Sequence, residues 1–111
     1  MYKRLYTIIK ETKHHPKTRQ FLGFPPELTE GKDYRIPLPW PKILIIEETH
    51  EGFFLYRYDV NKNFAGDTWH MTLEDAKYQA NSEYKNLLGE WKEIPKDVKD
   101  AIDFAIKQVS R

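Results

Sequence analysis

Cysteine is absent from the 111 residues, and its absence excludes three kinds of site. The sequence allows no disulfide framework, no thiolate nucleophile and no cysteine-ligated zinc. Glycine is also scarce, with five residues, and no Walker-type loop, nucleophile elbow or dinucleotide fingerprint occurs. We therefore predict no cofactor, and the lack of cysteine fits a reducing cytosol.

Long apolar runs and a strong excess of one charge are also missing. No run approaches the roughly 18 apolar residues of a membrane helix. Charged residues interrupt the first dozen positions, where a signal peptide would be apolar. We therefore expect a cytoplasmic protein without membrane contact. The net charge is +1, although residues 1–20 hold six Lys or Arg and one acid. We interpret this basic segment as a solvated face, with nucleic-acid binding as the alternative.

The chain does have enough apolar and aromatic residues for one core. Hydrophobic residues make up 40% of the sequence and aromatic residues 14%, which is more than a disordered chain contains. The length corresponds to one domain, and no repeats or linkers divide it. We treat residues 1–111 as a single domain.

Four stretches have the residue types of β-strands. β-branched and aromatic residues dominate residues 2–12, although the spacing there also fits a helix. Residues 42–46 form an apolar run, as expected of a strand that is covered on both faces. Two further strands follow hairpin turns, and glycine in the last strand predicts a bulge. The two strands are residues 53–58 and 64–69. The turns before them are residues 49–52 and 59–63, and the glycine is Gly66.

Two helices are predicted after these strands. Thr72 can accept a hydrogen bond from the amide of Asp75 and so cap the first helix, which is expected to stop at Gly89. Apolar residues at helical spacing from Val98 onward predict the second helix, with Pro95 at its first position. The buried stripe of the first helix is Leu73, Ala76, Ala80, Tyr84 and Leu87.

Together these elements predict an α+β domain, in which an antiparallel sheet of three to five strands is packed on one face by two helices. A short strand at residues 91–94 is expected between the helices. Residues 16–41 contain five prolines between Pro25 and Pro41. We interpret them as an irregular connection anchored by Trp40, with recognition of a partner's aromatic groove as the alternative.

Asp67 and His70 are the candidate catalytic pair of a small hydrolase. A carboxylate orients an imidazole only within hydrogen-bond reach. Along a strand, however, the side chains of Asp67 and His70 point to opposite faces. The pair therefore requires a bend at Gly66 or at the start of the helix. Without that bend these residues have structural roles, and the interpretation favours a protein that is not an enzyme.

Histidines and acidic residues lack the spacing of a metal site. No pair of histidines has the i, i+4 spacing of a helical zinc site, and adjacent His14 and His15 rarely ligate one ion. We therefore predict no metal site. The residues considered as ligands are His14, His15, His50, His70, Glu47, Glu48 and Glu51.

Aromatic residues provide the candidate binding surface. Tyr and Trp supply contact area and a hydrogen bond at interfaces, and the face of the sheet away from the helices could expose them. The alternative is that they form the core. Trp69 in particular is expected to be buried against Ala76 and Ala80, whose small side chains leave room for an indole. The candidate binding residues are Tyr56, Arg57, Tyr58, Trp69 and Trp40.

Part of the chain resembles a group of small bacterial proteins. The shared features are a strand at residues 53–59, the run Gly66-Asp-Thr-Trp-His70, a helix from Leu73, and Trp91. The resemblance covers about residues 52–94 and implies no activity. The size and architecture are also similar to those of immunity proteins of bacterial toxin systems. This likeness implies a non-enzymatic domain that binds another protein, with a toxin as its partner.

Overall fold

The fold is seen in a computed structural model that describes residues 2–10, 21–22 and 36–109. Its main sheet contains β1 (Arg4–Ile8), β4 (Ile43–Thr49), β5 (Gly52–Tyr58), β6 (Phe64–His70) and β7 (Lys92–Glu93). The helices are α1 (Leu73–Tyr84) and α2 (Ala101–Val109), and a 3₁₀ turn at Lys85–Leu87 extends α1. The short strands β2 (Phe21–Leu22) and β3 (Ile36–Pro37) pair separately.

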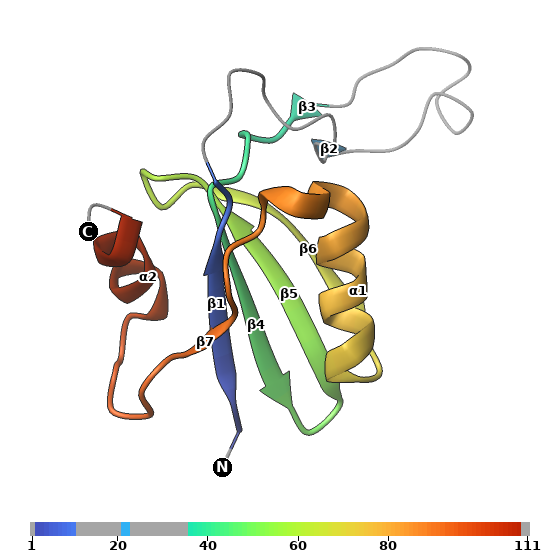
Figure 1. Cartoon of the computed structure of the whole chain (residues 1–111), viewed down its shortest axis with the longest axis vertical. Helices are drawn as coiled ribbons and strands as arrows, with labels where there is room; N and C mark the ends of the chain where they lie inside the picture. The colour runs from blue at the N-terminus through green and yellow to red at the C-terminus, as the bar shows by residue number, and fades with distance from the viewer. Residues whose placement is uncertain (1, 11–20, 23–35, 110–111) are drawn as a thin grey trace.

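The sheet has the strand order β6-β5-β4-β1-β7, and all of its neighbours are antiparallel. Two helices pack against it (Figure 1). The predicted α+β class, the antiparallel sheet and the order of the elements are confirmed. Of the prolines in residues 16–41, Pro37 lies in β3, and Pro39 and Pro41 lie in the connection before β4, whereas residues 16–20 and 23–35 lie outside the described part of the chain.

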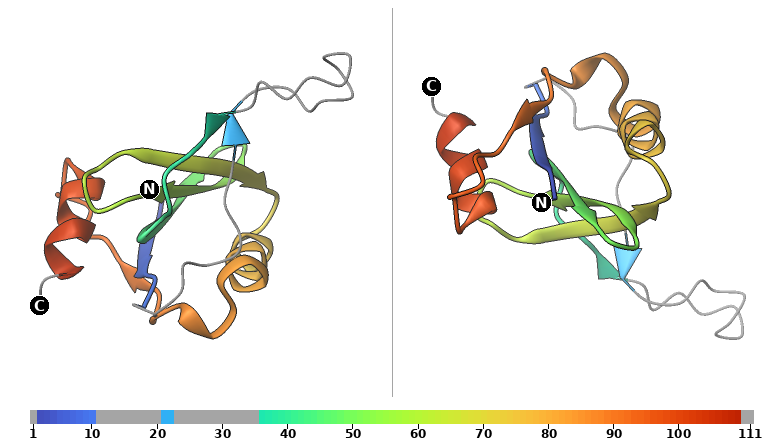
Figure 2. Two further views of the ribbon diagram at one scale, coloured as in Figure 1. Left: turned by 90° about the horizontal axis from the view of Figure 1, so that it is seen from above. Right: turned by 90° about the horizontal axis from the view of Figure 1, so that it is seen from below.

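The helices cover opposite faces of the sheet, instead of the single face that the sequence predicts. Leu44 and Ile46 of β4 belong to a core that includes Ala76 and Ala80 of α1. Their neighbours Ile43 and Ile45 belong to a second core beneath α2, with Ala105 at its centre. Successive side chains of a strand point to opposite faces, so the apolar run of β4 supplies both cores. Figure 2 shows α1 and α2 on the two sides of the sheet.

Turn and bulge residues set the register of β4, β5 and β6. His50 and Glu51 form a two-residue turn between β4 and β5. In the next turn the Asp59 carboxylate accepts hydrogen bonds from the amides of Asn61 and Asn63 at 2.9 Å. The register of β5 and β6 then shifts between Tyr56 and Tyr58. This shift is the bulge predicted at Gly66, which has a φ of 116°.

The start of α1 matches the prediction, whereas the start of α2 does not. Thr72 caps α1 by accepting a hydrogen bond from the amide of Asp75 at 3.1 Å. The second helix begins at Ala101, because the Asp100 carboxylate caps it. This carboxylate accepts a hydrogen bond from the amide of Asp103 at 2.9 Å. Pro95 instead begins a turn, in which its carbonyl accepts from the amide of Val98. Val98 still packs against the core beneath α2.

Gly52 is expected to resist substitution. Its φ is 139°, and an added Cβ would lie 2.7 Å from the carbonyl oxygen of His70 and 2.8 Å from Nε1 of Trp69. Gly52→Ala should therefore lower the free energy of unfolding by about 1–3 kcal/mol from backbone strain alone. Urea denaturation measures this loss. Gly89→Ala is the control, since its Cβ would meet ordinary contacts at 3.5 Å or more. Equal stability losses in the two variants would contradict the expectation.

Candidate functional site

A row of aromatic side chains covers the part of the sheet that α2 leaves uncovered. Phe54, Tyr56 and Tyr58 of β5 follow one another on one face, with ring centroids 5.7 and 6.4 Å apart. Phe64 of β6 meets Tyr58 edge-on at 6.2 Å, and Trp69 is the cross-strand partner of Phe54. We call these five residues the aromatic row. Such contiguous rings form a large, rigid and partly apolar surface.

Charged side chains border the aromatic row where it approaches α2. An open cleft of about 550 Å³ lies there, between β4, β5 and the start of α2. Tyr56 and Tyr58 form one wall of this cleft, and Ala101 and Ile102 contribute apolar surface from α2. The charged residues that line the cleft are Arg4, Glu47, Lys99 and Asp100.

The tyrosines of the row keep their phenolic protons over an extended pH range. Burial raises the pKa of Tyr56, and the negative charges of Glu47 and Asp67 raise it further. Burial also raises the pKa of Tyr58, and neighbouring Tyr56 adds to the effect. Both hydroxyls can therefore act as hydrogen-bond donors.

Trp69 lies on the surface, and the prediction that it is buried against Ala76 and Ala80 is wrong. Its side chain is 48% exposed. Strand alternation explains the difference, because Trp69 points to the face opposite α1 while the neighbouring Thr68 and His70 face that helix. The indole instead lies over Gly52. Trp40, another candidate binding residue, lies in the segment that connects β3 to β4. Its side chain is half-buried and does not line the cleft.

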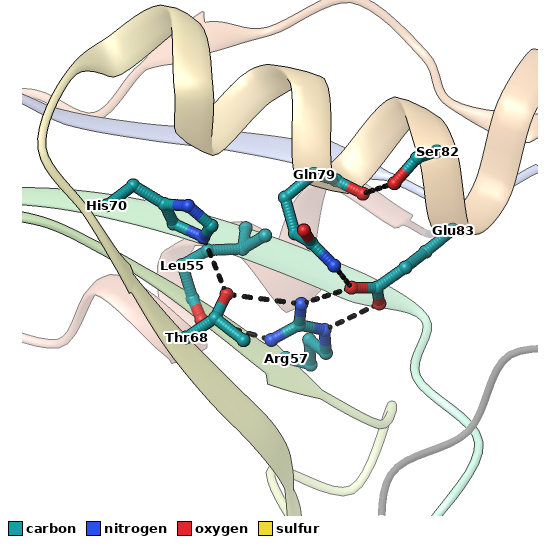
Figure 3. Close-up of polar contacts among 7 residues, drawn as sticks. All are labelled: Leu55, Arg57, Thr68, His70, Gln79, Ser82 and Glu83. Atoms are coloured by element: carbon teal, nitrogen blue, oxygen red, sulfur yellow. Dashed lines mark hydrogen bonds and ion pairs between the residues drawn. The ribbon is translucent and has the colours of Figure 1, made fainter.

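Arg57 does not belong to the exposed aromatic surface, although Tyr56 and Tyr58 do. It points to the face covered by α1, where its side chain is 0% exposed and that of Glu83 is 7% exposed. Two hydrogen bonds join the guanidinium to the Glu83 carboxylate, at 3.0 Å from Nε and 2.7 Å from Nη2 (Figure 3). Gln79 donates a further hydrogen bond to that carboxylate. The expected exposure of Arg57 is therefore wrong, since β5 turns it inward.

The structure does not bring Asp67 and His70 together. Asp67 points to the aromatic face, whereas His70 faces α1 and lies with Nε2 2.7 Å from the hydroxyl of Thr68. Thr68 also accepts a hydrogen bond from Nη2 of Arg57 at 3.3 Å. Burial lowers the pKa of His70, and the positive charge of Arg57 lowers it further. A neutral His70 can therefore accept a hydrogen bond from the Thr68 hydroxyl and continue the buried network (Figure 3).

The residues considered for a metal site do not assemble into one in the described ranges. No group of three or more His, Asp or Glu side chains with metal-binding geometry occurs there. His50 pairs with neighbouring Glu51, at 3.3 Å on the surface. His14 and His15 lie outside the described residues.

The basic N-terminal segment is described only as far as Lys10. Within that part, Arg4 donates hydrogen bonds to the carbonyl oxygens of Pro95 and Val98, each at 2.8 Å. Arg4 therefore ties β1 to the segment before α2. Lys3 and Lys10 are exposed. None of the helices in the described residues is both long and apolar enough to cross a membrane.

The binding candidates drawn from the sequence omit several members of these groupings. Glu83 and Gln79 hold Arg57. Phe54 and Phe64 belong to the aromatic row, and Glu47 borders it. Strand alternation already turns Arg57 toward the helix side, and a buried guanidinium requires an acidic partner. Glu83 lies next to the apolar stripe of α1, so this partner was available from the sequence. Glu47 follows the apolar run without any distinguishing pattern.

Comparison with protein-family models, with curated proteins and with solved structures found no match to this chain.

Removing one partner of the buried ion pair is expected to be costly. Glu83→Ala leaves the Arg57 charge buried without its carboxylate, which should lower the free energy of unfolding by about 3–5 kcal/mol. The double variant Arg57→Met/Glu83→Leu removes both charges and should recover much of this loss. Urea denaturation at neutral pH measures all three proteins. A control is Lys62→Ala, which breaks exposed ion pairs with Asp100 and Asp103 and should have a much smaller effect. A Glu83→Ala loss as small as this control would contradict a structural role for the pair.

His70 is expected to make stability depend on pH in the weakly acidic range. Its pKa in the folded protein lies below the ordinary value of 6.5. The unfolded chain therefore binds the proton more readily, and stability should fall as pH drops below about 6.5. This contribution is complete above the unfolded pKa. The measurement is the urea midpoint as a function of pH for the wild type and for His70→Gln. The variant should show a shallower fall, and an identical pH dependence would rule out His70 as the source.

Proposed function

We propose that the protein acts by binding another protein through the aromatic row. The observation that carries the proposal is the exposure of large aromatic side chains side by side on the β5–β6 face. Trp69 is 48% exposed and Phe64 is 43% exposed. Phe64 and Trp69 belong to neither of the two cores described above, and Trp and Tyr are enriched among the residues that contribute most to interfaces.

The placement of the two helices supports this choice of face. On the other side of the sheet, α1 covers Leu55 and the buried Arg57. On the aromatic side, Ile43 and Ile45 are buried beneath α2, and Tyr56 and Tyr58 pack against the same core in partly buried positions. On this face Phe64 and Trp69 of β6 remain exposed and accessible to a partner.

The geometry supports binding better than hydrolysis. The hydrolase alternative requires Asp67 to orient His70, and the two side chains lie on opposite faces of β6. His70 is instead hydrogen-bonded to Thr68 within a network that holds β5, β6 and α1 together. Neither the cleft beside Tyr56 and Tyr58 nor a second one between β1, β7 and α2 is lined by His70 or Asp67.

A bacterial toxin is the partner class suggested by the likeness of this domain in size and architecture to immunity proteins. In this form of the proposal the protein is an immunity protein that neutralises the toxin by occupying its surface. The aromatic row would supply the contact area, and the protein itself would need no catalytic group.

Truncating the exposed rings is expected to weaken partner binding without unfolding the domain. Phe64→Ala/Trp69→Ala removes two rings that are about half-exposed, so it should reduce affinity by about tenfold or more, which corresponds to about 1.4 kcal/mol. The experiment is a quantitative pull-down from the native host, followed by titration of the recovered partner against each variant. Circular dichroism confirms that the variants are folded.

Tyr78→Ala is the matched control. Tyr78 is 75% exposed, but it lies on α1, on the other side of the sheet. This variant should bind the recovered partner as tightly as the wild type does. The proposal is wrong if the partner binds equally well to the wild type and to the double variant.

A further inference from the structure

Two carboxylates flank the aromatic row. Glu47 of β4 is the cross-strand partner of Phe54, and Asp67 of β6 is the cross-strand partner of Tyr56. Because paired residues share a face, both carboxylates lie on the aromatic side of the sheet, one on each flank of β5. Asp67 is exposed and Glu47 is half-buried.

Neither carboxylate has a counter-ion within the described residues. Glu47 and Asp67 form no hydrogen bond or ion pair there, whereas other acidic groups near the cleft are engaged. Asp100 caps α2 and pairs with Lys62. The nearest cation by register is Arg4, which lies opposite Glu47.

Arg4 does not neutralise Glu47 by direct contact. Its guanidinium donates instead to the carbonyl oxygens of Pro95 and Val98. The negative charges act on the row itself, since both carboxylates raise the pKa of the Tyr56 hydroxyl. The aromatic row therefore combines partly exposed rings with negative charge that no other described residue offsets by contact.

We propose that the aromatic row binds an arginine-bearing segment of the partner, with the guanidinium lying on the ring of Tyr56 or Phe54 and paired with Glu47 or Asp67. A guanidinium is planar, stacks on aromatic rings and forms two parallel hydrogen bonds with a carboxylate. Its attraction to a ring face adds to the ion pair when the site is partly desolvated. This inference rests on the proposed protein-binding function and specifies the chemistry of the partner.

The test uses two synthetic peptides that differ only in charge. One alternates arginine and glycine, and the other has citrulline, the neutral isostere of arginine, at each arginine position. Amide and indole signals in two-dimensional NMR spectra of the full chain report binding. The arginine peptide should shift the signals of Tyr56, Asp67 and Trp69, and the shifts should weaken at high salt. The citrulline peptide should bind at least about tenfold more weakly.

Removing the carboxylates tests the same site from the protein side. Glu47→Gln/Asp67→Asn should reduce affinity for the arginine peptide by about tenfold. The matched control is Glu74→Gln/Glu90→Gln, which removes two exposed acids outside the row and should leave the affinity unchanged.

Two outcomes would overturn the inference. One is equal binding of the arginine and citrulline peptides, and the other is equal loss of affinity in the two charge variants. Neither outcome affects the proposed function, which depends on loss of the recovered partner by Phe64→Ala/Trp69→Ala. If that double variant keeps the partner, the proposed function fails on its own measurement.

Discussion

The alternation of side chains along β4 is the constraint on which both cores of the domain depend, one beneath each helix. Ile43 and Ile45 are buried beneath α2, while Leu44 and Ile46 are buried beneath α1. A strand that is apolar on both faces is stable only when each face is covered. With a helix on each side, the sheet forms the middle layer of the domain. The two helices then cover different widths of the sheet, and this difference leaves the aromatic row exposed.

The buried Arg57–Glu83 pair fixes the position of α1 on its face of the sheet. A buried ion pair contributes little net stability compared with well-packed apolar side chains, because both charges lose their hydration. Its two hydrogen bonds nevertheless form only when α1 has one position relative to β5. Apolar contacts alone tolerate sliding, whereas a misplaced guanidinium would remain buried without a partner. We infer that the pair selects one packing arrangement.

Local patterns in the sequence predicted the elements better than their placement in space. The α+β class, the hairpin turns, the bulge at Gly66 and the Thr72 cap each depend on a few neighbouring residues, and all are present. The side on which α2 packs depends on the path of the chain after β7, and no short pattern encodes it. The start of α2 was misplaced because Pro95 suits a helix start, while Asp100 provides the cap.

The candidate site was predicted in part. Tyr56, Tyr58 and Trp69 do share the exposed face, and Arg57 does not. Alternation along β5 was sufficient to separate Arg57 from the tyrosines, and alternation along β6 places Trp69 on the face opposite Thr68 and His70, which face α1. Glu47 and Asp67 flank the row only through the register of three strands, which a single sequence does not reveal. The charge of the site is thus a property of the assembled sheet.

The interior position of β1, between β4 and β7, also affects how the chain can fold. Among the strands of the main sheet it comes first in the sequence, yet it pairs with β4 on one edge and with β7 on the other. Its last backbone contact in the main sheet is made with Ile94, whose amide donates to the carbonyl of Arg4. The sheet therefore closes only after its other four strands have been synthesised. Pairings between such distant segments slow folding, and until β7 arrives one edge of β1 is open to wrong partners, including other nascent chains.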